Sequence, residues 1–308
     1  MSLSKIMLSL TGKLVASVFF AASIYITPVY AEDAAAPALW KLSDADSEIY
    51  LFGTVHMLDP NLSWHSAKVN TAFNEASTLI LEAPVLDTPP EEMQRIVMKH
   101  AMNAAGTGLS GLLSETGNRR LIEVLTSLNM SEEQAVATKQ SFEPLRPWIV
   151  GLQLAAMQAQ QQGADPSAGV DSVLEEAAKR AGKSLKYLES VEQQIQFFAG
   201  LSQEKETRML EESLSQMLED PDLLNAMVRD WIKGDAASVG RTLQDALDDP
   251  ELYAVLLTNR NQNWAQQIKT LMDGSGRYFI AVGTGHLVGK GSVQEFLALK
   301  GLTTTRVQ

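Results

Sequence analysis

Two stretches of this sequence, IYLFGTVHML at Ile49–Leu58 and FIAVGTGHLV at Phe279–Val288, repeat one pattern. In each stretch an apolar run ends at a glycine, Gly53 in the first and Gly283 in the second. A run of β-branched and aromatic residues that stops at glycine is typical of a β-strand that breaks into a tight turn, because glycine adopts backbone conformations closed to other residues. The repeat therefore predicts two strands of similar design that end in similar turns.

Each turn carries a histidine three residues after its glycine, His56 and His286. If the two strands are neighbours that point the same way, the two imidazoles converge. Converging imidazoles are half of a metal site, or a general base with its partner. A single copy would favour a turn with a hydrogen-bonded histidine, because short motifs often occur by chance. Two of the four histidines in the chain lie in this repeat, which favours a functional site.

The amino-terminal residues 1–31 have the features of an export signal. Lys5 and Lys13 form a basic start, and an apolar run follows at Leu14–Ile26. The small residue Ala31 then stands ahead of two acidic residues. The apolar run spans 13 residues, whereas a membrane-spanning helix needs roughly 20. We expect a cleaved signal peptide and an exported protein, periplasmic or secreted, without stable membrane insertion. An uncleaved amino-terminal anchor is the alternative.

The composition excludes several classes of function. The formal net charge of the 308 residues is −12, and loss of the two lysines in residues 1–31 would make it −14. Such an acidic chain is a poor partner for nucleic acid or an anionic membrane surface. Cysteine is absent from the sequence, so the chain has no thiol nucleophile and no thiolate ligand. The remaining residues 32–308 are long enough for one large domain.

Two further strand-like runs end at glutamates. Thr78–Leu81, TLIL, precedes Glu82, and Ser184–Leu188, SLKYL, precedes Glu189. A carboxylate directly after a buried strand must be paired, hydrogen-bonded or bound to a metal. An exposed loop acid is the alternative for Glu82. Together with the histidine turns, the sequence places two histidines and two glutamates at four strand ends.

The other segments read as helices and a hairpin around these strands. The segments at about 89–162 and 191–272 are helical, and Ser131 and Ser190 each begin a capping-box pattern. We expect a hairpin at residues 39–52, a helix at 64–76 capped by Ser63, and a closing strand at 303–307. His65 lies near the first histidine turn in sequence, which leaves a site role open. The pattern predicts an α/β (α+β) fold, with a central mixed sheet and large helical insertions.

The chain resembles the TraB/PrgY/GumN family, whose animal relatives include the Tiki proteases that cleave Wnt proteins. The resemblance extends from the hairpin at Trp40 to the final strand. The motifs that carry it are GTVH at 53–56, LILEAP at 79–84, AGVD at 168–171, YLESVEQQ at 187–194, NRN at 259–261 and AVGTGHLVG at 281–289.

The resemblance implies an α/β fold in which both histidines and a strand-end glutamate surround a divalent metal ion. Manganese or cobalt is favoured by the Tiki members, and zinc is possible. Carried over to this sequence, the implied metal ligands are His56, Glu82 and His286. Residues at matching positions with other roles are Glu189, Arg260, Asp171 and Asn261. Other members of the family are described as peptide-pheromone shutdown proteins or products of polysaccharide gene clusters, so the family does not fix one activity.

Three functions are consistent with these residues. The first is a divalent-metal-dependent hydrolase of peptide or protein substrates, with Glu189 as general base or fourth ligand and Arg260 holding a substrate carboxylate or an oxyanion. The second is a metal-free His/Glu hydrolase, the mode associated with the erythromycin-esterase-like proteins that share fold features with the family. The expected fold is erythromycin-esterase/ChaN-like. The third is a non-enzymatic envelope protein that sequesters peptides in a cleft of its helices.

Overall fold

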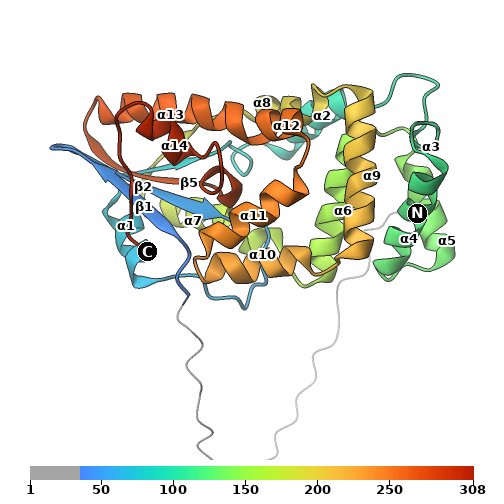
Figure 1. The fold of residues 1–308 in the computed structure, drawn as a ribbon, viewed down its shortest axis with the longest axis horizontal. Helices are drawn as coiled ribbons and strands as arrows, with labels where there is room; N and C mark the ends of the chain where they lie inside the picture. Colours follow the sequence, from blue (N-terminus) through green and yellow to red (C-terminus); the bar gives the residue numbers. More distant parts are fainter. Residues whose placement is uncertain (1–34) are drawn as a thin grey trace, which may run out of the picture. The chain divides into compact units, whose positions relative to one another are not determined.

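The computed structural model describes residues 35–308 of the 308-residue chain (Figure 1). The expected signal peptide at residues 1–31 lies outside the described residues. The six strands of one sheet are β1 Leu39–Ser43, β2 Ser47–Thr54, β3 Thr78–Leu81, β4 Ser184–Tyr187, β5 Gly276–Gly283 and β6 Thr305–Arg306.

The sheet is mixed, and its order is β4-β3-β5-β2-β1-β6. Strands β4, β3, β5 and β2 are parallel, whereas β1 pairs antiparallel with β2 and with β6. This arrangement confirms the predicted α/β fold with a central mixed sheet. The carboxyl ends of four parallel strands therefore meet at one edge, where α/β sheets commonly bind ligands.

Helices cover both faces of the sheet because its central strands are apolar on both sides. In β5, Phe279 and Ala281 face one layer, and Ile280 and Val282 face the other. The first layer consists of α1 Ala67–Glu75, α7 Val170–Arg180, α10 Leu223–Ile232 and α11 Ala236–Ala246. The second layer consists of α13 Asn259–Met272 and α14 Val293–Ala298 (Figure 1).

A separate helical region has its own apolar core, in which Leu121, Leu125, Leu154, Leu210 and Leu214 are fully buried. It consists of α3 Leu109–Leu112, α4 Glu115–Ser127, α5 Glu132–Phe142, α6 Pro147–Gln161 and α9 Gln203–Glu219. Within this region, α6 is on the side nearer the sheet (Figure 1). One face of α6 therefore packs into the helical core, and the opposite face is left for the strand ends.

The remaining elements are short or connect the two regions. They are α2 Pro90–Ala101, α8 Val191–Ala199, α12 Pro250–Tyr253, the 3-10 turns Pro166–Ala168 and Thr284–His286, and one π-helical turn at Ala254–Thr258. The capping boxes predicted at Ser131 and Ser190 are confirmed at the starts of α5 and α8. None of the helices in residues 35–308 is both long and apolar enough to span a bilayer.

Two predicted boundaries were wrong. The first helix begins at Ala67 and is capped by Ser66, not by Ser63, because the Ser66 side chain accepts the N–H of Val69. The closing strand shortens to Thr305–Arg306, because only these residues pair with β1 at the sheet edge.

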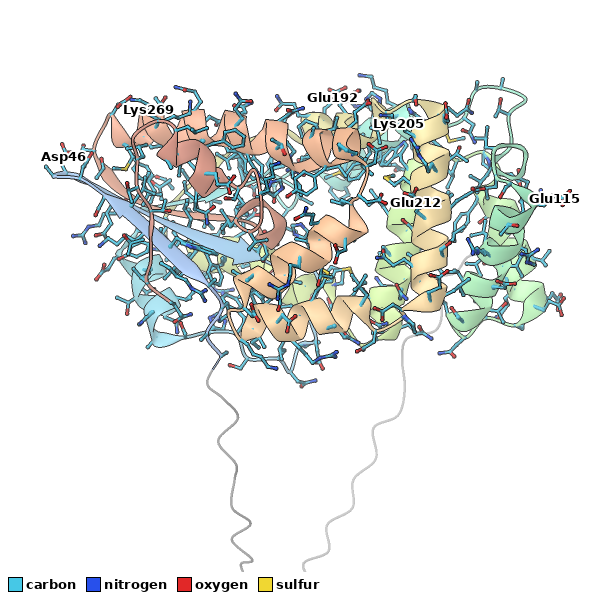
Figure 2. The ribbon with its side chains drawn as sticks, viewed as in Figure 1. Asp46, Glu115, Glu192, Lys205, Glu212 and Lys269 are labelled. Carbon is cyan, nitrogen blue, oxygen red and sulfur yellow. The ribbon has the colours of Figure 1, made fainter. Side chains whose placement is uncertain are left out.

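Many acidic side chains of residues 35–308 are exposed. Among the side chains labelled in Figure 2, Asp46 and Glu115 are exposed and point away from the body of the fold. Most charged side chains at the strand ends, in contrast, are buried and paired.

Candidate functional site

The site is built where β2 and β5 end side by side. Thr54 pairs with Gly283 in the parallel register, so the two histidine turns begin at the same level. A Cβ atom on Gly53 would lie 2.8 Å from Thr284 Oγ1 and 3.1 Å from Thr284 Cα. Any residue other than glycine at position 53 would therefore push the two turns apart.

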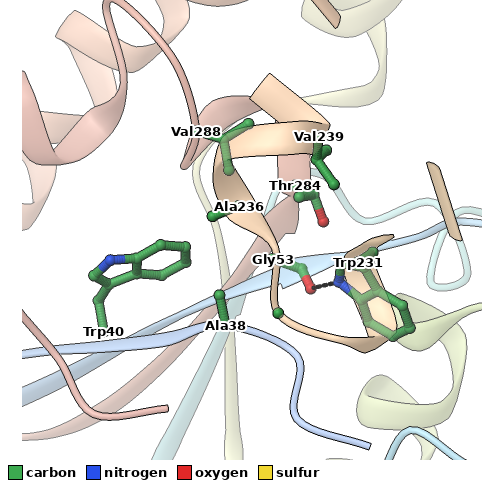
Figure 3. A pocket seen from close by; sticks show the side chains of 9 residues that line it. Ala38, Trp40, Gly53, Trp231, Ala236, Val239, Thr284 and Val288 are labelled. Atoms are coloured by element: carbon green, nitrogen blue, oxygen red, sulfur yellow. Dashed lines mark hydrogen bonds between the residues drawn. The ribbon is translucent and has the colours of Figure 1, made fainter. Parts of the chain in front are cut away.

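Trp231 of α10 holds the turn that follows Gly53. Its indole Nε1 donates a 2.9 Å hydrogen bond to the carbonyl oxygen of Gly53 (Figure 3). The void beside this contact measures about 10 Å³ and has an apolar lining that includes Ala38, Val239 and Val288. A space of that size scarcely admits one water molecule. Tight packing thus holds the turn that presents His56.

Three side chains face the space above Gly283. A Cβ atom on this residue would lie 3.1 Å from Glu82 Oε1, 3.6 Å from His56 Nε2 and 3.7 Å from His286 Cδ2. The N–H of Gly283 donates a 2.6 Å hydrogen bond to Glu82 Oε1, and His286 Nε2 lies 3.8 Å from the same oxygen. The structure therefore brings together the three residues for which the resemblance implied metal binding, and glycine leaves the space between them free.

The tautomer of His286 follows from its neighbours. Asn261 Nδ2 donates to the carbonyl oxygen of Gly291 at 2.7 Å, so its Oδ1 is the acceptor that faces His286 Nδ1 at 2.5 Å. The proton of the neutral ring is therefore on Nδ1, and the Nε2 lone pair faces Glu82. Burial lowers the pKa of His286 to about 3, against the attraction of Glu82, and keeps the ring neutral.

His56 is held in a similar way by Asp171, at the start of α7. Its Nδ1 lies 2.7 Å from Asp171 Oδ2, and Asp171 Oδ1 accepts a hydrogen bond from the Thr54 hydroxyl at 2.7 Å. The Asp171 carboxylate raises the pKa of His56 to about 9, so the metal-free ring is protonated at neutral pH. The side chain of His56 is 68% exposed, which makes it the accessible histidine of the pair.

Arg260 connects the two strand-end glutamates. Its Nη2 donates to Glu82 Oε2 at 2.6 Å and to Glu189 Oε2 at 2.9 Å. The guanidinium carbon lies 5.0 Å from the ring centre of Phe197 and 4.8 Å from that of Trp264. Arg260 is the second residue of α13, directly after the π-helical turn, a feature often found at functional sites. An arginine in this helix would usually be at the surface, but this side chain is only 11% exposed.

The carboxylate of Glu82 is kept ionised by its surroundings. Burial alone would raise its pKa, but the two imidazoles, the guanidinium and the Gly283 N–H outweigh burial and lower this pKa to about 2. Gln194 of α8 also donates to Glu82 Oε2 at 2.9 Å. The alternative that Glu82 is an exposed loop acid is wrong, since the residue is 9% exposed.

Glu189 is held by Arg260 and Trp264. Its Oε1 accepts hydrogen bonds from Trp264 Nε1 at 2.9 Å and Arg260 Nε at 3.0 Å, and its Oε2 accepts from Arg260. Both glutamates accept hydrogen bonds at both oxygens, but only Glu82 is among the residues nearest the space above Gly283. Trp264, four residues after Arg260 on the same helix face, was not identified from the sequence, although this spacing is the signal that could have found it.

The other two histidines are not at the site. His65 stacks on Trp64 with ring centres 3.8 Å apart, and its Nδ1 lies 3.3 Å from Asn70 Oδ1. His100 is in the last turn of α2, where its Nε2 is 3.3 Å from Oε1 of Glu192 in α8. The site role left open for His65 has no support in this geometry.

Two cavities meet at the strand ends. The larger, about 540 Å³, lies between α6 and α10, and we call it the α6–α10 cavity. The smaller, about 470 Å³, extends over α7 and α8, and we call it the α7–α8 cavity. His56, Glu82, Leu152 and Arg260 line both of them. The charged groups of the site are therefore accessible from two sides.

Comparison with known proteins identifies the family. The model of the TraB/PrgY/gumN family matches residues 38–306, nearly the whole described chain. The chain belongs to the TraB/PrgY/gumN family. It is 28% identical over 263 residues to the uncharacterized protein YbaP of Escherichia coli K12, covering 85% of this chain and 92% of YbaP. It is 29% identical over 250 residues to YbaP of Shigella flexneri, covering 80% and 87%. No solved structure matches the chain.

In this member of the TraB/PrgY/gumN family, the residues above Gly283 fit a divalent cation by their chemistry. Each histidine is held through Nδ1 by an oxygen acceptor, which is the usual arrangement for a histidine that binds a metal through Nε2. With neutral histidines, the three carboxylates of Glu82, Glu189 and Asp171 and the guanidinium of Arg260 sum to a formal charge of −2, which one divalent ion would balance. Within residues 35–308, however, no three His, Asp or Glu side chains already stand in ligand geometry.

We expect Arg260→Met to destabilise the protein strongly. The substitution leaves two carboxylates buried without their shared cation, since the side chains of Glu82 and Glu189 are 11% and 4% exposed. Removal of one partner of a buried pair costs about 3 to 5 kcal/mol of unfolding free energy. Urea titration of the purified variant measures the loss.

The matched control is Arg229→Met, because Arg229 pairs with Asp222 on the surface, where the two side chains are 56% and 58% exposed. We expect this control to change the unfolding free energy by less than about 1 kcal/mol. Equal losses in the two variants would show that the Arg260 bridge is not a stabilising feature of the fold.

Proposed function

We propose that this protein is a hydrolase of peptide bonds that uses a divalent metal ion held by His56, Glu82 and His286. The observation that carries the proposal is the convergence of these three side chains on the space above Gly283. Family membership adds support, because metal-dependent proteolysis is implied by the resemblance to the Tiki members. A divalent ion in this position would polarise a carbonyl group and make hydroxide available near neutral pH.

The residues of the chain have separate tasks in this proposal. Glu82 and the two Nε2 atoms supply the ligands, and Asp171 and Asn261 hold the two rings in the orientation that points Nε2 inward. Arg260 lines both cavities and places a positive charge beside the carbonyl oxygen of a bound substrate, where negative charge develops during hydrolysis. We assign Glu189 the task of positioning Arg260, in place of the base or ligand role expected from the sequence.

A metal-free hydrolase is the second candidate, and the charge state of His56 favours it. Asp171 raises the pKa of His56 to about 9, so at neutral pH this exposed imidazolium could donate its Nε2 proton to a leaving amine. In this reaction Glu82, with its pKa near 2, would be the carboxylate that orients the attacking water, and the proton that this water loses would pass to the neutral His56 left after the amine is protonated. The two candidates differ in what His56 Nε2 carries, a proton or a metal ion.

We also propose that the protein acts outside the cytoplasm, on peptide or protein substrates of the periplasm or the medium. The basic and apolar residues 1–31 support export. Mass measurement of the protein purified from the cell envelope tests this, because removal of residues 1–31 would leave 277 residues (308 − 31).

Elemental analysis tests the metal site. After dialysis against manganese, cobalt or zinc, the wild-type protein should retain about one ion per chain, and His56→Ala/His286→Ala should retain none. His65→Ala is the control, because His65 lies outside the site and should leave the metal content unchanged. Retention of a stoichiometric ion by the double variant would rule out this ligand set. Cleavage of a peptide library by the loaded wild-type protein, lost on chelation, is the matching activity measurement.

Gly283→Ala tests the same site without removal of a ligand. The backbone of Gly283 has φ −47° and ψ 133°, which alanine also adopts, so the fold should persist. The added methyl group would lie among Glu82, His56 and His286 and should weaken manganese affinity by about tenfold or more. Isothermal titration measures the affinity. Gly151→Ala is the control, because its nearest neighbour atom, on Leu210, is at an ordinary 3.8 Å. Unchanged affinity in Gly283→Ala would place the ion elsewhere.

Proton release separates the two candidate functions. Because the pKa of His56 is raised to about 9, the ring must lose a proton before Nε2 can bind an ion. Manganese binding at pH 7 should therefore release close to one proton, and its affinity should rise with pH until the pH approaches 9. Titration in buffers of different ionisation enthalpy counts the protons. Binding that releases no proton in the wild type would exclude His56 as a ligand.

A further inference from the structure

The two cavities adjoin at the site, and we call the pair the path across the site. The α6–α10 cavity and the α7–α8 cavity share His56, Glu82, Leu152 and Arg260, and each extends away from these residues on its own side. Their volumes, about 540 and 470 Å³, both lie within the range of typical ligand pockets, roughly 300 to 1,000 Å³. A ligand that crosses the shared residues can therefore place groups in both cavities at once.

The walls of this path are apolar. Of the eight large hydrophobic side chains exposed in residues 35–308, four line it. Val85 and Leu86 line the α7–α8 cavity, Leu224 lines the α6–α10 cavity, and Leu152 lines both. On α6 the small residues Ala155, Ala156 and Ala159 leave room for a ligand against that helix. Exposed apolar side chains gathered in a cleft indicate a binding surface.

The charged groups of the path are already paired. Among the described residues that line either cavity, Arg260 is bound to Glu82 and Glu189, and Asp171 is bound to His56. The carboxylate of Glu175, 3% exposed at the side of the α7–α8 cavity, lies 2.9 Å from Lys179 Nζ, although its Oε1 accepts no hydrogen bond. A free amino or carboxyl terminus of a ligand would have to compete with an existing ion pair for each of these charges.

We infer that the substrate is an internal segment of a polypeptide, with apolar side chains on both sides of the bond that is cut, seated across the α6–α10 and α7–α8 cavities. The inference rests on the proposed function and adds the selectivity of the site. Two open cavities on either side of the reacting groups fit an endopeptidase, whereas an exopeptidase needs a closed end and a charge for the chain terminus.

Peptide binding tests the inference. Short fluorescent peptides, capped at both ends, carry leucines on both sides of a central Ala-Ala, on one side only, or on neither side with serines in their place. Fluorescence anisotropy with chelator-treated protein measures their affinities without cleavage. Each apolar side should improve affinity by about tenfold or more, because burial of one large apolar side chain has that effect.

Variants assign each side of the peptide to one cavity. Leu224→Ser should remove the preference for leucine on one side of the peptide, and Leu86→Ser the preference on the other. Val136→Ser is the matched control, because Val136 is 54% exposed on α5 and lines neither cavity, so it should change nothing. All three positions are more than a third exposed, so the substitutions should leave the fold intact.

The inference is overturned if the serine peptide binds as tightly as the leucine peptide, or if both cavity variants weaken the same side. It is also overturned if uncapped peptides bind about tenfold more tightly than capped ones, which would show recognition of a terminus. Cleavage with manganese, followed by mass spectrometry, separates this inference from the proposed function. Equal cleavage of all peptides would refute the selectivity but support a peptidase, and side-specific binding without any cleavage would refute the peptidase alone.

Discussion

The structure depends on one buried electrostatic constraint, the Arg260 guanidinium between the carboxylates of Glu82 and Glu189. Parallel strands deliver their carboxyl ends to the same edge, so residues that follow neighbouring strands β3 and β4 are brought together. The N–H of Glu189 donates to the carbonyl oxygen of Glu82 at 2.8 Å, which holds the two backbones side by side. Two carboxylates so close and so buried would repel each other, and the cation from α13 makes the arrangement stable.

Helix α13, which carries Arg260, also positions His286. Asn261, next to Arg260 in α13, fixes the ring of His286, and Trp264 packs against that ring with centres 4.3 Å apart while it donates to Glu189. Arg260 and Asn261 therefore couple the glutamates of β3 and β4 to the histidine that follows β5. This shared support explains why one short Asn-Arg-Asn sequence can serve both halves of the site.

The helical region contributes a wall, not chemistry. One face of α6 buries Leu154 in the helical core, and its opposite face presents Leu152 and three alanines to the cavities. A change in the helical core can thus alter the cleft without contact with Glu82 or the histidines.

Much of the site could be predicted from the sequence because its signals are local. Glycine marks the end of the apolar run before His56 and before His286, and a glutamate directly follows the other two runs. Counting along the chain therefore placed His56, Glu82, Glu189 and His286 at strand ends. The order of the strands and the parallel direction of β2 and β5 are not local properties. The structure supplies them, and they decide that these side chains meet.

Only the tertiary structure decided what each side chain does at that edge. The sequence could not show that Glu189 faces Arg260 and Trp264. It also could not show that Asp171 raises the pKa of His56 or that burial lowers the pKa of His286. It also could not show the two cavities, whose walls come from α6, α8 and α10. The sequence by itself determined which chemical groups stand at the strand ends, because strand and turn are short-range patterns. Their partners and charge states depend on distances between residues far apart in the sequence, 178 positions for Glu82 and Arg260 and 201 for Glu82 and Gly283. Only the packed fold sets those distances.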